Sequence, residues 1–170
     1  MGAALKEKWP PEHEEWSRRS EELTTAARTV RHLVQEADAS RRANPRRRLH
    51  PRDVDLDYRN LRELERVTFH IQDMTEILSD VIWQDDDPYT VPFQDSGPLA
   101  DAMTATGDLL SSFHGEDVTS QRKLFATAEA AVADCMAATA DRDPDEGTVT
   151  ASESILLSLH RILRAVRPAS

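Results

Sequence analysis

The sequence predicts an all-α fold, an antiparallel up-and-down helical bundle of about five helices with a four-helix-bundle-like core. Apolar residues recur at alternating steps of three and four along most of the chain, which places them on one face of a helix. No segment shows a convincing strand alternation, and most of the five glycines and nine prolines fall between the periodic segments. We expect one domain over residues 11–170, after a loose N-terminus at residues 1–10.

The first periodic segment predicts a helix from about Pro11 to Arg42. Pro11 and the glutamates that follow it suit a first helical turn, where a missing donor is harmless and negative charge meets the helix dipole. Asn44-Pro45 ends the segment, because proline cannot continue the helix and restricts the residue before it. The short connection that follows predicts that the next helix returns alongside this one.

The longest periodic segment runs from Asp53 to about Trp83 and predicts the helix that all the others cover. At about 1.5 Å per residue it would be roughly 45 Å long. Asp53 is its expected N-cap. The apolar stripe should be buried along its whole length and contains Leu61, Leu64, Val67, Thr68, Ile71, Met74, Thr75, Leu78, Val81 and Ile82.

Three shorter helices are expected in the rest of the chain. The third begins at Ser96-Gly97-Pro98, ends at His114-Gly115 and carries apolar residues through Phe113. The fourth is capped near Asp117 or Thr119, ends at Arg142-Asp143-Pro144 and presents a stripe rich in alanine, from Leu124 to Ala138, that predicts close helix approach. The fifth follows a capping box of Thr150 and Glu153 and runs to about Val166.

Composition limits the function classes. A formal charge of -10 argues against nucleic acid as the main partner, because proteins that bind phosphate backbones present a net or clustered positive face. No apolar run approaches the length of a membrane span, and the start of the chain does not resemble a signal peptide. The single cysteine, Cys135, fits a reducing compartment and should behave as a small buried hydrophobe. We therefore expect a cytoplasmic protein, with the inner face of the plasma membrane as an alternative place.

The sequence lacks the common catalytic and metal-binding motifs. There is no Glu-x-x-His pair of a diiron bundle, no His-Glu-x-x-His, no paired CxxC, no phosphate loop and no Gly-x-Ser-x-Gly. These absences favour a protein that is not an enzyme and needs no cofactor. His32 with Glu36 looks like an ordinary helical pair, and His160 like a partly buried packing residue.

Three local groups of residues are candidates for a metal or ligand site. His70, Asp73 and Glu76 are each one helical turn apart, so they could line up as metal ligands; we favour the interpretation that they form the solvated face of their helix. Tyr89 and Phe93 lie in the long segment after Trp83. We favour them as anchors of that crossover, and the alternative is a pocket, shared with His70 and Asp73, for a small aromatic ligand. Asp85-Asp86-Asp87 lacks the ligand spacing of a calcium loop and is interpreted as solvated charge.

A cluster of arginines interrupts this acidic sequence between the first two helices. We favour the interpretation that the cluster complements the C-terminal dipole of the first helix and solvates a loop. The alternatives are a surface that contacts anionic lipid headgroups or a protein partner and, last, weak binding of nucleic acid. The members of the cluster are Arg41, Arg42, Arg46, Arg47, Arg48 and Arg52.

The run EADASRRANPRRRLHPRDVDLDYRNLRELERVTFHIQDMTEIL resembles the cytosolic helical region of actinobacterial fusaric acid resistance proteins, also described as aromatic acid exporters. The motif-like part covers residues 36–78, and no membrane helix accompanies it. The resemblance implies an accessory, oligomerisation or partner-binding module of a membrane-exporter-like protein, acting as a homo-oligomer or with a protein partner. The alternative is a soluble bundle that binds a small aromatic ligand or a metal ion.

Overall fold

A computed structural model describes residues 13–43, 51–83, 93–113, 117–140 and 151–167. At several helix ends, among them residues 51–57, 82–83 and 93–96, it describes the backbone alone. These residues form five α-helices, α2 (His13–Ala43), α3 (Pro51–Trp83), α4 (Phe93–Ser112), α5 (Val118–Ala140) and α6 (Ala151–Ala165), and no strand occurs among them. The predicted all-α fold is confirmed.

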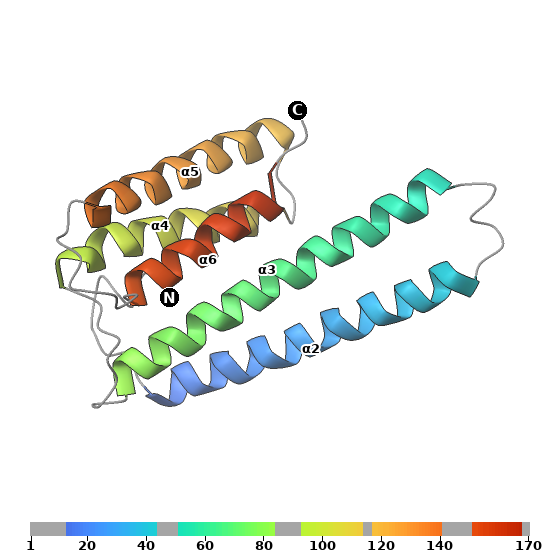
Figure 1. Ribbon diagram of the computed structural model, residues 1–170, viewed down its shortest axis with the longest axis horizontal. Coiled ribbons are helices and arrows are strands. Elements are labelled where there is room, and N and C mark those ends of the chain that lie inside the picture. The colour runs from blue at the N-terminus through green and yellow to red at the C-terminus, as the bar shows by residue number, and fades with distance from the viewer. Residues whose placement is uncertain (1–12, 44–50, 84–92, 114–116, 141–150, 168–170) are drawn as a thin grey trace.

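The helices are arranged as two hairpins with α6 between them (Figure 1). One hairpin pairs the long helices α2 and α3, which run side by side in opposite directions, and the other pairs α4 and α5. Helix α6 packs against α3, α4 and α5, whereas α2 packs along α3. Helix α6 therefore makes most of the helix-to-helix contact that joins the two hairpins within the described ranges.

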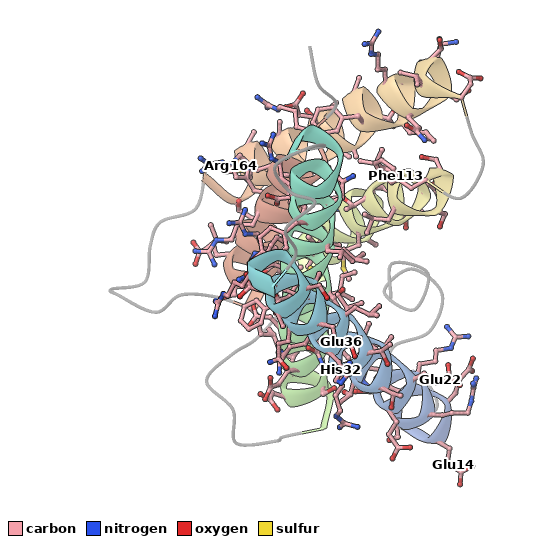
Figure 2. The ribbon with its side chains drawn as sticks, turned by 90° about the vertical axis from the view of Figure 1, so that its right-hand side faces the viewer. Glu14, Glu22, His32, Glu36, Phe113 and Arg164 are labelled. Carbon is pink, nitrogen blue, oxygen red and sulfur yellow. The ribbon has the colours of Figure 1, made fainter. Side chains whose placement is uncertain are left out.

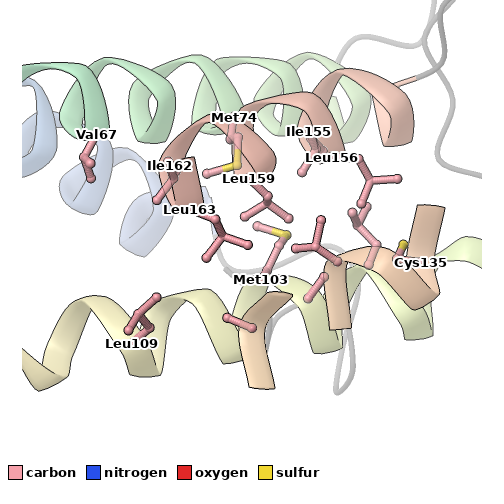
Figure 3. Packing of buried hydrophobic residues seen from close by; sticks show 14 of the residues in the cluster. Val67, Met74, Met103, Leu109, Cys135, Ile155, Leu156, Leu159, Ile162 and Leu163 are labelled. Carbon is pink, nitrogen blue, oxygen red and sulfur yellow. The ribbon is translucent and has the colours of Figure 1, made fainter. Parts of the chain in front are cut away.

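The main hydrophobic core lies around α6. Figure 3 shows Met74 of α3, Met103 of α4 and Leu159 of α6 gathered in the same part of this core. Helix α6 is the most strongly amphipathic of the five and buries one face completely, including Ile155, Leu159 and Ile162. The core cluster draws its fully buried members from α3, α4, α5 and α6. Helix α2 supplies only the partly buried Trp16 to it among the described residues.

Helix α2 is attached to α3 by a separate seam. Among the described side chains of α2, Ala27 and Val34 are buried, and they are seven residues apart, as the alternating steps of three and four predict. Near one end of the seam the indole Nε1 of Trp16 donates a 2.8 Å hydrogen bond to Ser79 Oγ of α3. This bond links the N-terminal part of α2 to the C-terminal part of α3.

Local signals are found at the N-terminal ends of α5 and α6. Asp117 caps α5 as predicted, because its Oδ1 accepts hydrogen bonds from the backbone N–H groups of Thr119 and Ser120 at 2.7 and 2.9 Å. Glu153 lies in the first turn of α6, while its predicted capping partner Thr150 falls outside the described residues.

Some predicted boundaries and burials are wrong. Helix α4 begins at Phe93, before the predicted start, and Pro98 lies inside it, where the missing N–H removes one backbone bond early in the helix. Leu64, Phe113 and Ala138 were expected on buried stripes but are exposed, Leu64 by 47% and Phe113, at the end of α4 in Figure 2, by 49%. Periodicity identifies the apolar face of a helix, but it does not reveal how far a neighbouring helix covers that face.

Candidate functional site

The arginine cluster predicted from the sequence falls mostly outside the described part of the structure. Arg46, Arg47 and Arg48 are outside it, and Arg41 and Arg52 are described only as helical backbone. The side chain of Arg42 is exposed and pairs with Asp38 one turn earlier on α2. The proposed lipid or partner role of the cluster therefore stays a prediction.

His70, Asp73 and Glu76 are not brought together as metal ligands. Among the residues that the structure describes, no three His, Cys, Asp or Glu side chains are grouped so as to hold a metal ion. The favoured interpretation of a solvated face is also wrong for two of the three, because α6 packs against that side of α3. Asp73 accepts a 2.9 Å hydrogen bond from the buried Ser158 of α6, and His70 is half-buried, whereas Glu76 is exposed.

The environment of His70 is electropositive and partly dehydrated. Burial lowers the pKa of its imidazole below the usual value, the nearby Arg161 guanidinium of α6 lowers it further, and Asp73 acts in the opposite direction. The Nδ1 atom of His70 is buried and forms no hydrogen bond with the described protein groups. A neutral imidazole is the form that this environment favours.

The aromatic-ligand pocket predicted at His70, Asp73, Tyr89 and Phe93 cannot be assembled from the described residues. Tyr89 lies outside them, as does the acidic run at residues 85–87, and Phe93 is described only as the first residue of α4. His70 and Asp73 instead face α6.

A basic groove between α3 and α6 is the feature that sequence reasoning missed. Its volume is about 690 Å³, and we call it the α3–α6 groove. It is lined by Arg59, Asn60, Glu63, Arg66, His70, Arg161, Arg164, Ala165 and Arg167. Part of the signal was present in the spacing, because Arg161 and Arg164 are three residues apart and so share one side of α6, while Arg167 follows just after the end of that helix. Their alignment with arginines of α3 required the tertiary structure.

The arginines of the groove differ in how far they are neutralised. Arg66 pairs with Glu63 at 2.8 Å, and Arg167 pairs with Glu129 of α5 at 2.8 Å. Arg59, Arg161 and Arg164 are exposed and form no ion pair or hydrogen bond with another described side chain. Figure 2 shows Arg164 on the side of the molecule away from Glu14 and Glu22 of α2. The groove is thus a locally cationic site on an acidic chain.

A second surface lies where the α2–α3 hairpin extends past α6. Helix α3 has 33 residues and α6 has 15, so at about 1.5 Å per residue α3 is roughly 27 Å longer. Ser158 contacts Asp73, and Arg161 influences His70, so the C-terminal end of α6 comes level with the middle of α3. Among the described helices, α2 is therefore the main neighbour of the N-terminal part of α3.

Two large leucines are exposed on this extension. Leu33 of α2 is 46% exposed and Leu64 of α3 is 47% exposed. Counting along both helices from the bond between Trp16 and Ser79 puts the two leucines at nearly the same level. Arg31 and Arg62 line a groove on one side of the seam. Leu33 and Leu64 each come two residues after one of these arginines, and two residues correspond to a rotation of about 200° around the helix axis. The two leucines therefore lie on the other side of the seam. We call Leu33 and Leu64 the hairpin leucine pair.

The remaining candidate residues are mainly structural. Cys135 is buried in the core, as predicted. His32 and Glu36 form an exposed pair on α2, with 3.6 Å between His32 Nδ1 and Glu36 Oε2 (Figure 2). His160 was expected to be a partly buried packing residue, and this is wrong: it is exposed, because it lies beyond the edge of the buried face of α6 that Leu159 and Leu163 help to form.

None of the described helices is long and apolar enough to cross a membrane. Comparisons of the chain with protein-family models, curated proteins and solved structures find no match. The resemblance of residues 36–78 to exporter proteins therefore remains a prediction from the sequence.

Proposed function

We propose that the protein is a non-enzymatic helical module that associates with a second copy of itself through the α2–α3 hairpin. It would serve as a cytoplasmic accessory or oligomerisation module of an exporter-like membrane protein. The exporter part of this proposal rests on the resemblance of residues 36–78, and the association part rests on the geometry of the hairpin.

The observation that carries the proposal is the interrupted burial of the α3 stripe. Val67, Met74 and Leu78 are buried in the core, whereas Leu64, one turn before Val67 on the same stripe, is 47% exposed. The stripe continues toward the N-terminus of α3, where Leu33 of α2 is exposed at nearly the same level as Leu64. Covering such surface with another apolar surface is favourable by about 25 cal/mol for each Å² removed from water.

A second copy of the chain is the partner that this geometry fits best. Around a two-fold axis, the hairpin leucine pair of one copy would meet the same pair of the other, so a single apolar patch is self-complementary. Two long hairpins packed in this way would also form a further four-helix arrangement, the usual solution for helices with one apolar face.

The test is the mass of the protein in solution over a range of concentrations. Sedimentation equilibrium of the wild-type chain should show a dimer that dissociates on dilution. Leu33→Glu combined with Leu64→Glu should give a monomer at all concentrations, because two buried carboxylates from each copy would face each other.

A matched control uses two exposed apolar residues elsewhere on the surface. Val118 of α5 and Leu157 of α6 are 60% and 51% exposed, so Val118→Glu with Leu157→Glu adds the same charge. This variant should remain a dimer. A wild-type monomer, or equal loss of association in both double variants, would refute association through the hairpin.

A further inference from the structure

We propose that the α3–α6 groove is a binding site for a small soluble polyanion of the diphosphate or triphosphate class. This site is independent of the hairpin leucine pair and of the self-association proposed above. It uses Arg59 of α3 with Arg161 and Arg164 of α6.

The first support is the supply of unpaired guanidinium groups. Arg59, Arg161 and Arg164 line one groove and form no ion pair with another described side chain. The other two arginines of the groove are held in place by Glu63 and Glu129. Guanidinium groups offer paired N–H donors that match phosphate oxygens, and several such groups together match a ligand with several negative charges.

The second support is the chemistry of the rest of the lining. Among the described residues that line the groove, Ala165 is the only apolar side chain, so this lining offers no pocket for the apolar anchor of a peptide. Asn60 and His70 add neutral polar groups beside the arginines. The volume of about 690 Å³ lies within the range of sites for small molecules.

The net charge of the protein decides between small and large anions. An anionic membrane, a nucleic acid or an acidic protein would meet the whole surface of a chain with a formal charge of -10. A small ligand responds mainly to charges within a Debye length, which is about 8 Å at physiological ionic strength. The local excess of arginine in the groove can therefore attract a small polyanion although the molecule as a whole repels anions.

The neighbourhood of His70 gives an internal reporter of the site. Burial lowers the pKa of His70 most, and the positive potential of Arg161 lowers it further, whereas Asp73 raises it. A bound polyanion would offset that potential, so it should raise the pKa of His70. This shift can be followed by NMR of the imidazole signals independently of the heat of binding.

Inorganic tripolyphosphate is the probe for the test. Isothermal titration calorimetry at low and at physiological ionic strength should show one site per chain, weaker at the higher salt. Arg161→Gln with Arg164→Gln should weaken binding by about tenfold or more, because it removes two charge-assisted contacts. Arg122→Gln with Lys123→Gln, which removes two exposed positive charges from α5, should bind as the wild type does.

Each contrary result would overturn the proposal. One such result is the absence of binding heat when tripolyphosphate is added to the wild-type protein at low salt. Another is an equal loss of affinity in both double variants, which would mean that net charge alone attracts the anion. In a separate arm, sedimentation with vesicles containing phosphatidylserine should show no binding. Vesicle binding that is lost in the α6 double variant would mean that the groove recognises lipid headgroups instead. Circular dichroism would establish that each variant is folded.

Discussion

Ser158 of α6 donates a 2.9 Å hydrogen bond to Oδ2 of Asp73 in α3, and this bond joins the two helices at the interface beside the core. Ser158 is buried, whereas Asp73 retains some access to solvent. The bond therefore satisfies a hydroxyl group that would otherwise be buried without a partner.

Replacing Ser158 by alanine should lower the free energy of unfolding by about 1.5 kcal/mol, the usual size for a bond to a charged group. Urea unfolding followed by circular dichroism measures this change. Ser154→Ala on the same helix is the control, because it makes the same change in helix propensity at a half-buried site. Equal stability of the two variants would mean that the bond to Asp73 contributes nothing.

Truncating a side chain on the buried face of α6 should lower the free energy of unfolding by more than Ser158→Ala does. Leu159 is 1% exposed and lies where the two hairpins meet α6, so Leu159→Ala should destabilise the fold by about 3 kcal/mol through lost burial and a cavity. Leu157→Ala, at an exposed position of the same helix, should change the free energy of unfolding by less than about 1 kcal/mol. Similar losses for both variants in urea unfolding would contradict the central position of α6.

The lowered pKa of His70 predicts a pH dependence of stability. The folded protein binds a proton at His70 less readily than the unfolded chain does. The contribution of the neutral His70 to the stability of the fold is therefore complete above the pKa of histidine in the unfolded chain, about 6.5. It is lost as the pH falls below that value. Comparing urea unfolding at pH 7.5 and pH 5.5, about one unit on either side of that value, should show a smaller loss of stability in His70→Gln than in the wild type.

The control for this experiment is His32→Gln, because His32 is exposed beside Glu36 on α2 and does not face α6. It should keep the wild-type dependence on pH. If His70→Gln lost as much stability as the wild type on acidification, burial against α6 and Arg161 would not control the protonation of His70.

The N-cap of α5 predicts a second effect of pH, in a more acidic range. Hydrogen bonds from the backbone N–H groups of Ser120 and Thr119 lower the pKa of Asp117 below the usual carboxyl value. The ionised carboxylate of Asp117 therefore stabilises the fold at pH values above the pKa of aspartate in the unfolded chain, about 3.9. This stabilisation is lost as the pH falls through the lowered pKa of Asp117 in the folded protein.

Thermal unfolding of two variants separates the cap from its charge. Asp117→Ala should lower the melting temperature at neutral pH, while Asp117→Asn, which keeps an acceptor for both N–H groups, should lower it less. The difference in melting temperature between the wild type and Asp117→Ala should become smaller in strong acid. A difference that stayed constant down to acid pH would mean that the ionised carboxylate is not what stabilises the cap.

The sequence was informative wherever a signal is local. The four-three pattern of Ala27 and Val34, the cap at Asp117 and the stripe through Met74 and Leu78 each depend on residues within a few turns of one another. Local backbone bonds and one apolar face are enough to determine a helix and its inner side. These signals predicted the all-α fold, most helix boundaries and the buried Cys135.

The tertiary structure alone decided what lies beside each helix. It turned His70 and Asp73 from an expected solvated face into an interface with α6, left Leu64 uncovered, and aligned Arg161 and Arg164 with Arg59 of α3. Helical periodicity records the direction of a side chain around its own axis, whereas the length and position of the neighbouring helix come from packing between residues far apart in the chain. The sequence by itself thus determined the helices and their apolar faces, and long-range packing determined which of those faces became core, groove or exposed surface.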